Sequence, residues 1–245
     1  MEHLNLFDAL LAVVIFVIVP IQSAVAFPSF IREIRARGSD ARVDAYKRTV
    51  ATWAFFGVLL VGFWLVTDRS WAALGFRLPT WSQFFMGSAI GLAFLIFLVL
   101  QLRAIKASGT GADVMRQQLG DLADFMPVTK RDSFWFRWVS INAGFTEELI
   151  FRGYVMWALE PVMGLAMAAV MTVVIFTFAH SYQGLKQVPA IGLASVLTII
   201  IFLVSDSLLV PIVFHVVLDL VQGVYLKAIL QSQPTSDEPL VDTSN

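Results

Sequence analysis

Residues 147–152 read Glu-Glu-Leu-Ile-Phe-Arg and place three charged side chains inside a hydrophobic segment. A charged side chain at the centre of a bilayer costs about 2.5–3.5 kcal/mol on insertion scales, so such residues are rare and usually functional. Glu148 and Arg152 are four residues apart and can pair on one helix face. Glu147 points about 100° away from that face. A buried ion pair that only fixes helix packing would explain Glu148 and Arg152 but not Glu147, which we interpret as a carboxylate free to take a proton.

The composition is that of an integral membrane protein. Of the 245 residues, 58% are hydrophobic and 14% are charged, whereas soluble domains carry about 25% charged residues. The chain has no cysteine, which excludes disulfides, thiolate metal sites and a cysteine nucleophile. The net charge is −1, and no feature of the sequence indicates binding to nucleic acid.

Apolar stretches long enough to cross a bilayer recur along the chain, each near the ~20 residues that a spanning helix needs. We therefore predict an all-α, polytopic transmembrane helix bundle with about seven spans. Little of the chain remains for a soluble catalytic domain, so the chemistry is expected within the bundle. The predicted spans are residues 4–27, 50–67, 82–102, 136–158, 161–181, 188–204 and 207–230.

The orientation follows from the basic residues. Residues 1–10 lack the Lys and Arg of a secretory signal, so we predict that the first span is retained. With the N-terminus outside, residues 28–49 form a basic cytoplasmic loop. Every Lys and Arg then lies on the cytoplasmic side except Arg69, Arg77 and the intramembrane Arg152. Because cytoplasmic loops are enriched in Lys and Arg, we predict an outside N-terminus and a cytoplasmic C-terminus.

We expect one structural domain in three parts. Residues 1–135 would form N-terminal transmembrane helices and cytoplasmic loops, residues 136–230 the catalytic core, and residues 231–245 a disordered tail. Residues 112–126 alternate apolar and polar side chains at helical spacing, which predicts an amphipathic helix on the cytoplasmic surface in contact with membrane lipid. The oligomeric state is not indicated by the sequence.

Three further ionisable residues occur in later apolar segments. His180 ends the fifth span, and His215 and Asp219 share one face of the last span at one-turn spacing. Two histidines with Glu or Asp can hold a catalytic divalent metal such as zinc, with one position open for water. Alternatively, a glutamate can activate water while a histidine stabilises the oxyanion, without a cofactor. Both routes lead to hydrolysis. By the predicted spans His180 lies nearer the cytoplasm than Glu147, unless its helix continues to about residue 185.

Three motifs occur in order on successive hydrophobic helices: EExxxR (Glu147, Glu148, Arg152), FxxxH (Phe176, His180) and HxxxD (His215, Asp219). Together they resemble the CPBP family, which contains type II CaaX prenyl endopeptidases and bacterial Abi-type bacteriocin-processing or immunity proteins. The resemblance covers about residues 136–230 and implies an intramembrane endopeptidase with a cavity open to the cytosolic leaflet. The implied substrate is a prenylated CaaX-like or membrane-embedded peptide. The stretch at 74–79, Leu-Gly-Phe-Arg-Leu-Pro, looks like one in bacterial members, which implies a bacterial plasma membrane.

By this resemblance Glu147 would activate water and His180 would assist it. His215 and Asp219 would bind the oxyanion, or a metal together with Glu147 and His180, while Glu148 and Arg152 would support the site. Asp219 departs from the Asn of eukaryotic CaaX proteases. An ionised Asp accepts hydrogen bonds but cannot donate them, which favours a metal ligand or a partner that orients His215.

Two other functions are open at this stage. The protein could be a non-catalytic immunity or interaction protein of the same family, although no catalytic residue is missing from its motifs. It could also be a small transporter that uses the buried acids as a proton relay. That function favours inverted repeats, and the sequence has no visible repeat.

Overall fold

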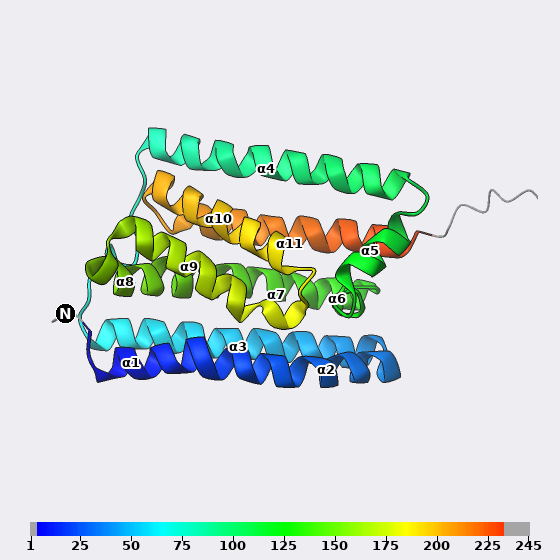
Figure 1. The fold of residues 1–245 in the computed structure, drawn as a ribbon, viewed down its shortest axis with the longest axis horizontal. Coiled ribbons are helices and arrows are strands. Elements are labelled where there is room, and N and C mark those ends of the chain that lie inside the picture. Colours follow the sequence, from blue (N-terminus) through cyan, green and yellow to red (C-terminus); the bar gives the residue numbers. More distant parts are fainter. Residues whose placement is uncertain (1–3, 233–245) are drawn as a thin grey trace, which may run out of the picture.

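The computed structural model describes residues 4–232, and these residues are helical apart from turns and short connections (Figure 1). No β-strand occurs in this part of the chain, so the all-α prediction is confirmed. The predicted disordered tail lies outside the described residues except for its first two positions.

Among the described residues, six helices are long and apolar enough to cross a membrane, and they match six of the seven predicted spans. The first combines α1 (Leu6–Val13), the π-helical segment η1 (Val14–Ile18) and α2 (Val19–Arg37). The fourth of them combines α9 (Leu165–Ala179) with the short 3-10 helix η3 (Ser181–Gln183). The others are α3 (Ser39–Val66), α4 (Trp81–Ala107), α10 (Val188–Ser205) and α11 (Leu209–Leu230).

The remaining predicted span, 136–158, lies within a continuous helical segment that is too charged to belong to those six. This segment consists of α7 (Lys130–Glu148), the π-helical η2 (Leu149–Val155) and α8 (Met156–Met163). It packs between α3 and α11, and every residue of η2 is buried. Because residues 146–156 are all buried, Glu147, Glu148 and Arg152 are not presented to lipid.

Two predictions about the connecting segments are wrong. Residues 28–49 are not a loop, because α2 runs to Arg37 and α3 begins at Ser39. Gly38 has a φ of 64°, a left-handed conformation that glycine adopts without steric cost. The chain therefore reverses direction at this single residue. Likewise, residues 112–126 do not form a single helix. Gly120, with a φ of 55°, separates α5 (Gly111–Leu119) from α6 (Leu122–Phe125).

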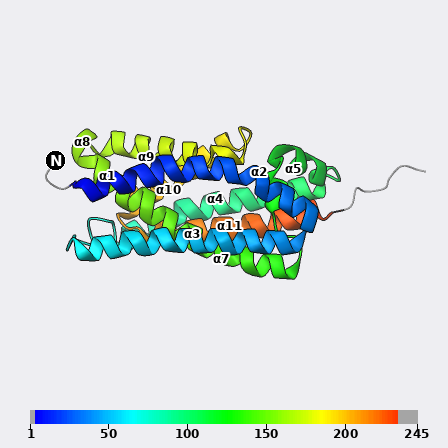
Figure 2. The same cartoon turned by 90° about the horizontal axis from the view of Figure 1, so that it is seen from below.

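The long helices run side by side (Figure 1). The helices α1–α3 form one side of the bundle, α4 forms the opposite side, and α7–α11 lie between them. The view from below shows α1 and α8 at one end of the bundle and α5 at the other (Figure 2). Helix α11 runs toward the end of the bundle that carries α5, which is opposite to the end where α1 begins.

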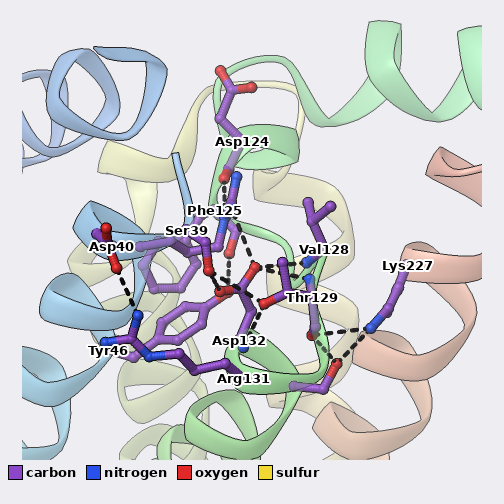
Figure 3. Close-up of polar contacts among 12 residues, drawn as sticks. Ser39, Asp40, Tyr46, Asp124, Phe125, Val128, Thr129, Arg131, Asp132 and Lys227 are labelled. Atoms are coloured by element: carbon purple, nitrogen blue, oxygen red, sulfur yellow. Dashed lines mark hydrogen bonds and ion pairs between the residues drawn. The ribbon is translucent and has the colours of Figure 1, made fainter. Parts of the chain in front are cut away.

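Polar contacts around Asp132 fix the start of α7 (Figure 3). Its buried carboxylate accepts hydrogen bonds from the Ser39 hydroxyl, from the backbone N–H of Val128 and Thr129, and from Arg42 at 3.1 Å. Thr129 in turn caps α7 by accepting the backbone N–H of Asp132. These contacts tie the start of α7 to α3, and they position the helix that ends at the two glutamates.

Candidate active site

Glu148 and Arg152 form the predicted pair. Arg152 Nη1 donates to Glu148 Oε1 at 3.1 Å, and both side chains are fully buried. Arg152 Nη2 donates to the Ser195 hydroxyl at 2.9 Å, to the Ser195 carbonyl at 3.0 Å and to the Thr198 hydroxyl. The guanidinium of Arg152 is thus held by Glu148, the last residue of α7, and by Ser195 and Thr198 of α10. This network supplies acceptors for both Nη atoms of the buried guanidinium, whereas Arg152 Nε and Glu148 Oε2 have no hydrogen-bond partner among the described residues.

Close packing of α7 on α11 brings His215 to the same carboxylate. A Cβ on Gly144 would stand 2.6 Å from Val216 Cγ2 and 2.9 Å from the Val216 nitrogen, so only glycine fits there. Next to this contact, His215 Nδ1 lies 2.7 Å from Glu148 Oε1. An ionised carboxylate only accepts hydrogen bonds, so Nδ1 carries the hydrogen and Nε2 is available to the site.

His180 follows the last residue of α9 and reaches the site from there. Helix α9 ends at Ala179, and the chain continues as η3 rather than as a longer α-helix. His180 Nδ1 lies 2.8 Å from the Phe176 carbonyl oxygen. A carbonyl only accepts, so His180 also has its hydrogen on Nδ1. Its Nε2 faces Glu147 Oε2 at 3.5 Å, so the two residues do meet despite the span depths inferred from sequence.

Glu147 Oε2 therefore lies near the imidazoles of both His180 and His215. It lies 3.5 Å from His180 Nε2 and 4.0 Å from His215 Nε2. Asp219 Oδ1 lies 3.9 Å from His215 Nε2, beyond hydrogen-bond distance, so the hydrogen bond that orients His215 comes from Glu148. The side chain of Asp219 is 30% exposed and that of Glu147 8%. The site is thus most open at Asp219.

The residues have donor types that suit zinc, since imidazole and carboxylate are its usual ligands besides cysteine. Within residues 4–232, no three His, Asp or Glu side chains are grouped so that they could hold a metal ion. A metal therefore stays a prediction, and the chemistry below is derived from the side chains alone.

Sequence reasoning missed the partners of Arg152 on α10. Ser195 and Thr198 are three residues apart in an otherwise apolar helix, so they share a face. A polar pair at this spacing inside a span could have indicated a buried partner for a charge. The contact between Glu148 and His215 left no such signal, because it joins residues 67 positions apart.

Residues 130–221 match the family model described as type II CAAX prenyl endopeptidase Rce1-like. This segment is similar to the Rce1-like family. The match confirms the predicted resemblance to the CPBP family of CaaX proteases. It covers just over a third of the chain, begins at the first residue of α7 and includes all six predicted site residues. No match was found among the curated proteins or among the solved structures.

The Rce1-like family is generally one of proteases, and the match therefore indicates CAAX-type protease activity. Together with the six apolar helices, it identifies the chain as an integral membrane protein.

Proposed function

We propose that the protein is an intramembrane endopeptidase that hydrolyses a peptide bond beside Glu147, His180 and His215. The position of Glu147 Oε2, 3.5 Å and 4.0 Å from the Nε2 atoms of the two histidines, carries this proposal. A water molecule held there would have a carboxylate to take its proton. The two imidazoles would lie beside the carbonyl oxygen of the substrate, which becomes negative when the water attacks.

In the proposed reaction, Glu147 removes a proton from water and the water oxygen attacks the carbonyl carbon of the substrate. The resulting oxyanion is stabilised by an imidazole that carries hydrogen on both nitrogens. Each Nδ1–H already has an acceptor, Phe176 O for His180 and Glu148 Oε1 for His215, so each Nε2 can serve the reaction. The C–N bond then breaks, and Glu147 returns the proton to the departing amine.

Glu148 and Arg152 support the reaction in this proposal. Glu148 accepts from both Arg152 and His215 through one oxygen, Oε1, so it keeps His215 turned toward Glu147. Asp219 places a negative charge 3.9 Å from His215 Nε2. As the most exposed of the four catalytic candidates, it is the one that we expect to meet the substrate.

The proposed substrate is a prenylated CaaX-like peptide or another membrane-embedded peptide cut near the cytosolic leaflet. We further propose a bacterial plasma membrane with the N-terminus outside. The family match supports a CAAX-type peptide substrate, and the apolar helices support a membrane location. The bacterial assignment rests on the stretch at residues 74–79, and the orientation rests on the distribution of Lys and Arg. An endopeptidase of this kind would bind both the membrane lipid and the peptide.

The test is cleavage of farnesylated and unprenylated CaaX peptides, and of transmembrane peptides, by the purified protein in lipid nanodiscs. Glu147→Gln should lower turnover by about 10²–10⁴-fold, while thermal unfolding stays unchanged. Glu160→Gln, which changes an exposed carboxylate of α8, is the matched control. Normal turnover by Glu147→Gln would contradict the proposal.

A chelator arm of the same assay tests the cofactor. Hydrolysis that persists after dialysis against a chelator supports the metal-free reaction. Loss of activity that zinc restores would instead favour the metal-dependent one.

A further inference from the structure

His180 is part of a series of aromatic rings. The Phe176 and His180 ring centroids are 4.3 Å apart with an interplanar angle of 26°. The next ring is that of Tyr182, whose centroid is 6.3 Å from that of His180 at an angle of 27°. At the inner end of this series, the guanidinium of Arg152 lies 4.8 Å from the Phe176 ring centroid. The series thus begins at the buried ion pair and ends at Tyr182.

Tyr182 is held between the site and a separate helix. It lies in η3 and is partly buried. Its ring meets that of Phe27 of α2 edge-on, with centroids 5.5 Å apart. No other aromatic ring among the described residues is in ring contact with both His180 and α2.

The two histidines differ in how firmly they are held. His215 lies in the interior of α11, and Nδ1 is bound to the buried carboxylate of Glu148. His180 lies just beyond the end of α9, where helical backbone conformation is lost (φ −99°, ψ 1°). Its Nδ1 is bound only to the carbonyl one turn back. One hydrogen bond alone would let the imidazole plane turn about it, so the rings of Phe176 and Tyr182 on His180 restrain the direction in which Nε2 points.

We propose that Tyr182 is a positioning residue for His180, and that its ring, braced by Phe27, holds the imidazole plane in line with Glu147. This inference rests on the proposed function for its effect on turnover, but the ring geometry stands independently of it. The ring rather than the hydroxyl carries the role, because the interaction with His180 is between two rings whose planes are 27° from parallel. Phenylalanine at position 182 therefore preserves it and leucine does not.

The ring contact is tested by NMR of the protein labelled with ¹³Cε1-histidine in nanodiscs. The chain has three histidines, and the His180 signal is the one that disappears in His180→Gln. The Tyr182→Leu variant removes the ring current of Tyr182 and should shift the His180 signal, whereas Tyr182→Phe should leave it in place. A His180 signal that stays in place in Tyr182→Leu overturns the proposal, whether or not a substrate is known.

Turnover is tested with the same variants. Tyr182→Leu should lower kcat on the order of 10- to 100-fold, because small misplacements of a catalytic group have effects of this size, while KM stays unchanged. Tyr182→Phe should retain most of the wild-type kcat. Phe178→Leu is the matched control, since that ring of α9 is 67% exposed and outside the series. If Tyr182→Leu unfolds, Phe27→Leu, which removes the brace of Tyr182, should lower kcat in the same direction.

Equal loss of kcat in Tyr182→Phe and Tyr182→Leu would overturn the ring-positioning role. Unchanged kcat in Tyr182→Leu with a shifted His180 signal would also overturn it. If the wild-type protein cleaves no peptide, the proposed function fails, and the NMR shift alone decides whether Tyr182 holds His180.

Discussion

Glu148 Oε1 accepts the Nδ1 hydrogen of His215 at 2.7 Å and, at 3.1 Å, a hydrogen from Arg152. One buried oxygen thus joins α7 to α11 directly and, through Arg152, to α10. The charges that make the sequence unusual for a membrane protein therefore hold three helices together. They also orient a proposed catalytic imidazole, so a change in this network should affect both stability and activity.

Arg152→Ala should strongly destabilise the fold. Removing one partner of a buried ion pair costs about 3–5 kcal/mol, because the remaining charge is left buried without compensation. The Glu148 side chain is fully buried and would be that charge. Thermal unfolding in detergent measures the effect, with expression yield as a second readout.

Arg48→Ala is the control for this change, because Arg48 pairs with Glu33 in an exposed position. Such surface pairs contribute little, and its unfolding temperature should stay close to that of the wild type. Equal stability of both variants would show that the buried network does not support the bundle.

Gly144→Ala should separate α7 from α11. The added Cβ would stand 2.9 Å from the backbone nitrogen of Val216, so a helix has to move rather than a side chain. We expect a loss of about 1–3 kcal/mol, typical of overpacking, and a large fall in turnover because Glu148 moves away from His215. Gly62→Ala is the control, since nothing lies within 4 Å of its Cβ. A fully active Gly144→Ala would contradict the role of this contact.

The parts of the site that could be predicted from the sequence are those set by spacing within one helix. Glu148 and Arg152 are four residues apart, and helix geometry alone brings them together. The contact of Glu147 with His180 depends on the packing of α7 against neighbours far away in the chain. Its distance could not be derived from the sequence, although the motif resemblance indicated that these residues act together.

The limits of the helices were predicted less well than their existence. An apolar run shows which residues can lie in lipid, but a helix can continue beyond that run through polar residues. Helix α2, for example, extends past the predicted limit at residue 27 to Arg37. The charged segment Lys130–Met163 shows the opposite case. Its burial by neighbouring helices depends on tertiary packing, so composition alone does not place it in the bundle.

The contribution of Asp132 to the stability of the fold should depend on pH. Burial acts to raise the pKa of this carboxyl, but hydrogen bonds from Ser39, Thr129 and Val128 outweigh it and hold the pKa below the usual 3.8. The carboxylate therefore stabilises the fold at pH values above 3.8, and this contribution is lost as the pH falls through the lowered pKa. In Asp132→Asn we expect a loss of about 1–3 kcal/mol at neutral pH, as for a buried hydrogen-bonded group that loses its partner.

The measurement is the unfolding temperature of both proteins between pH 7 and pH 3. The difference between wild type and Asp132→Asn should shrink as the pH falls below 4. Asp44→Asn, which changes an exposed partner of Arg37, should follow the wild type throughout. A difference that is constant with pH would contradict a role for the ionised carboxylate.

The proposed orientation can be tested at the two ends of the bundle. Ser70, between α3 and α4, lies at the end where α1 begins, and Ser108 follows α4 at the end that carries α5 (Figure 1). The first end has few basic residues, and two of them, Arg69 and Arg77, pair with Asp8 and Asp206. Its positive charge is thereby reduced, and the positive-inside rule assigns it to the outside.

The chain has no cysteine, so single cysteines at these exposed serines can be labelled without background. In intact cells an impermeant maleimide should label Ser70→Cys but not Ser108→Cys, and permeabilised cells should show both. The reverse pattern would place the basic end outside. The more open side of the site could then not face the cytosolic leaflet, and a substrate presented there could not be cut in the proposed way.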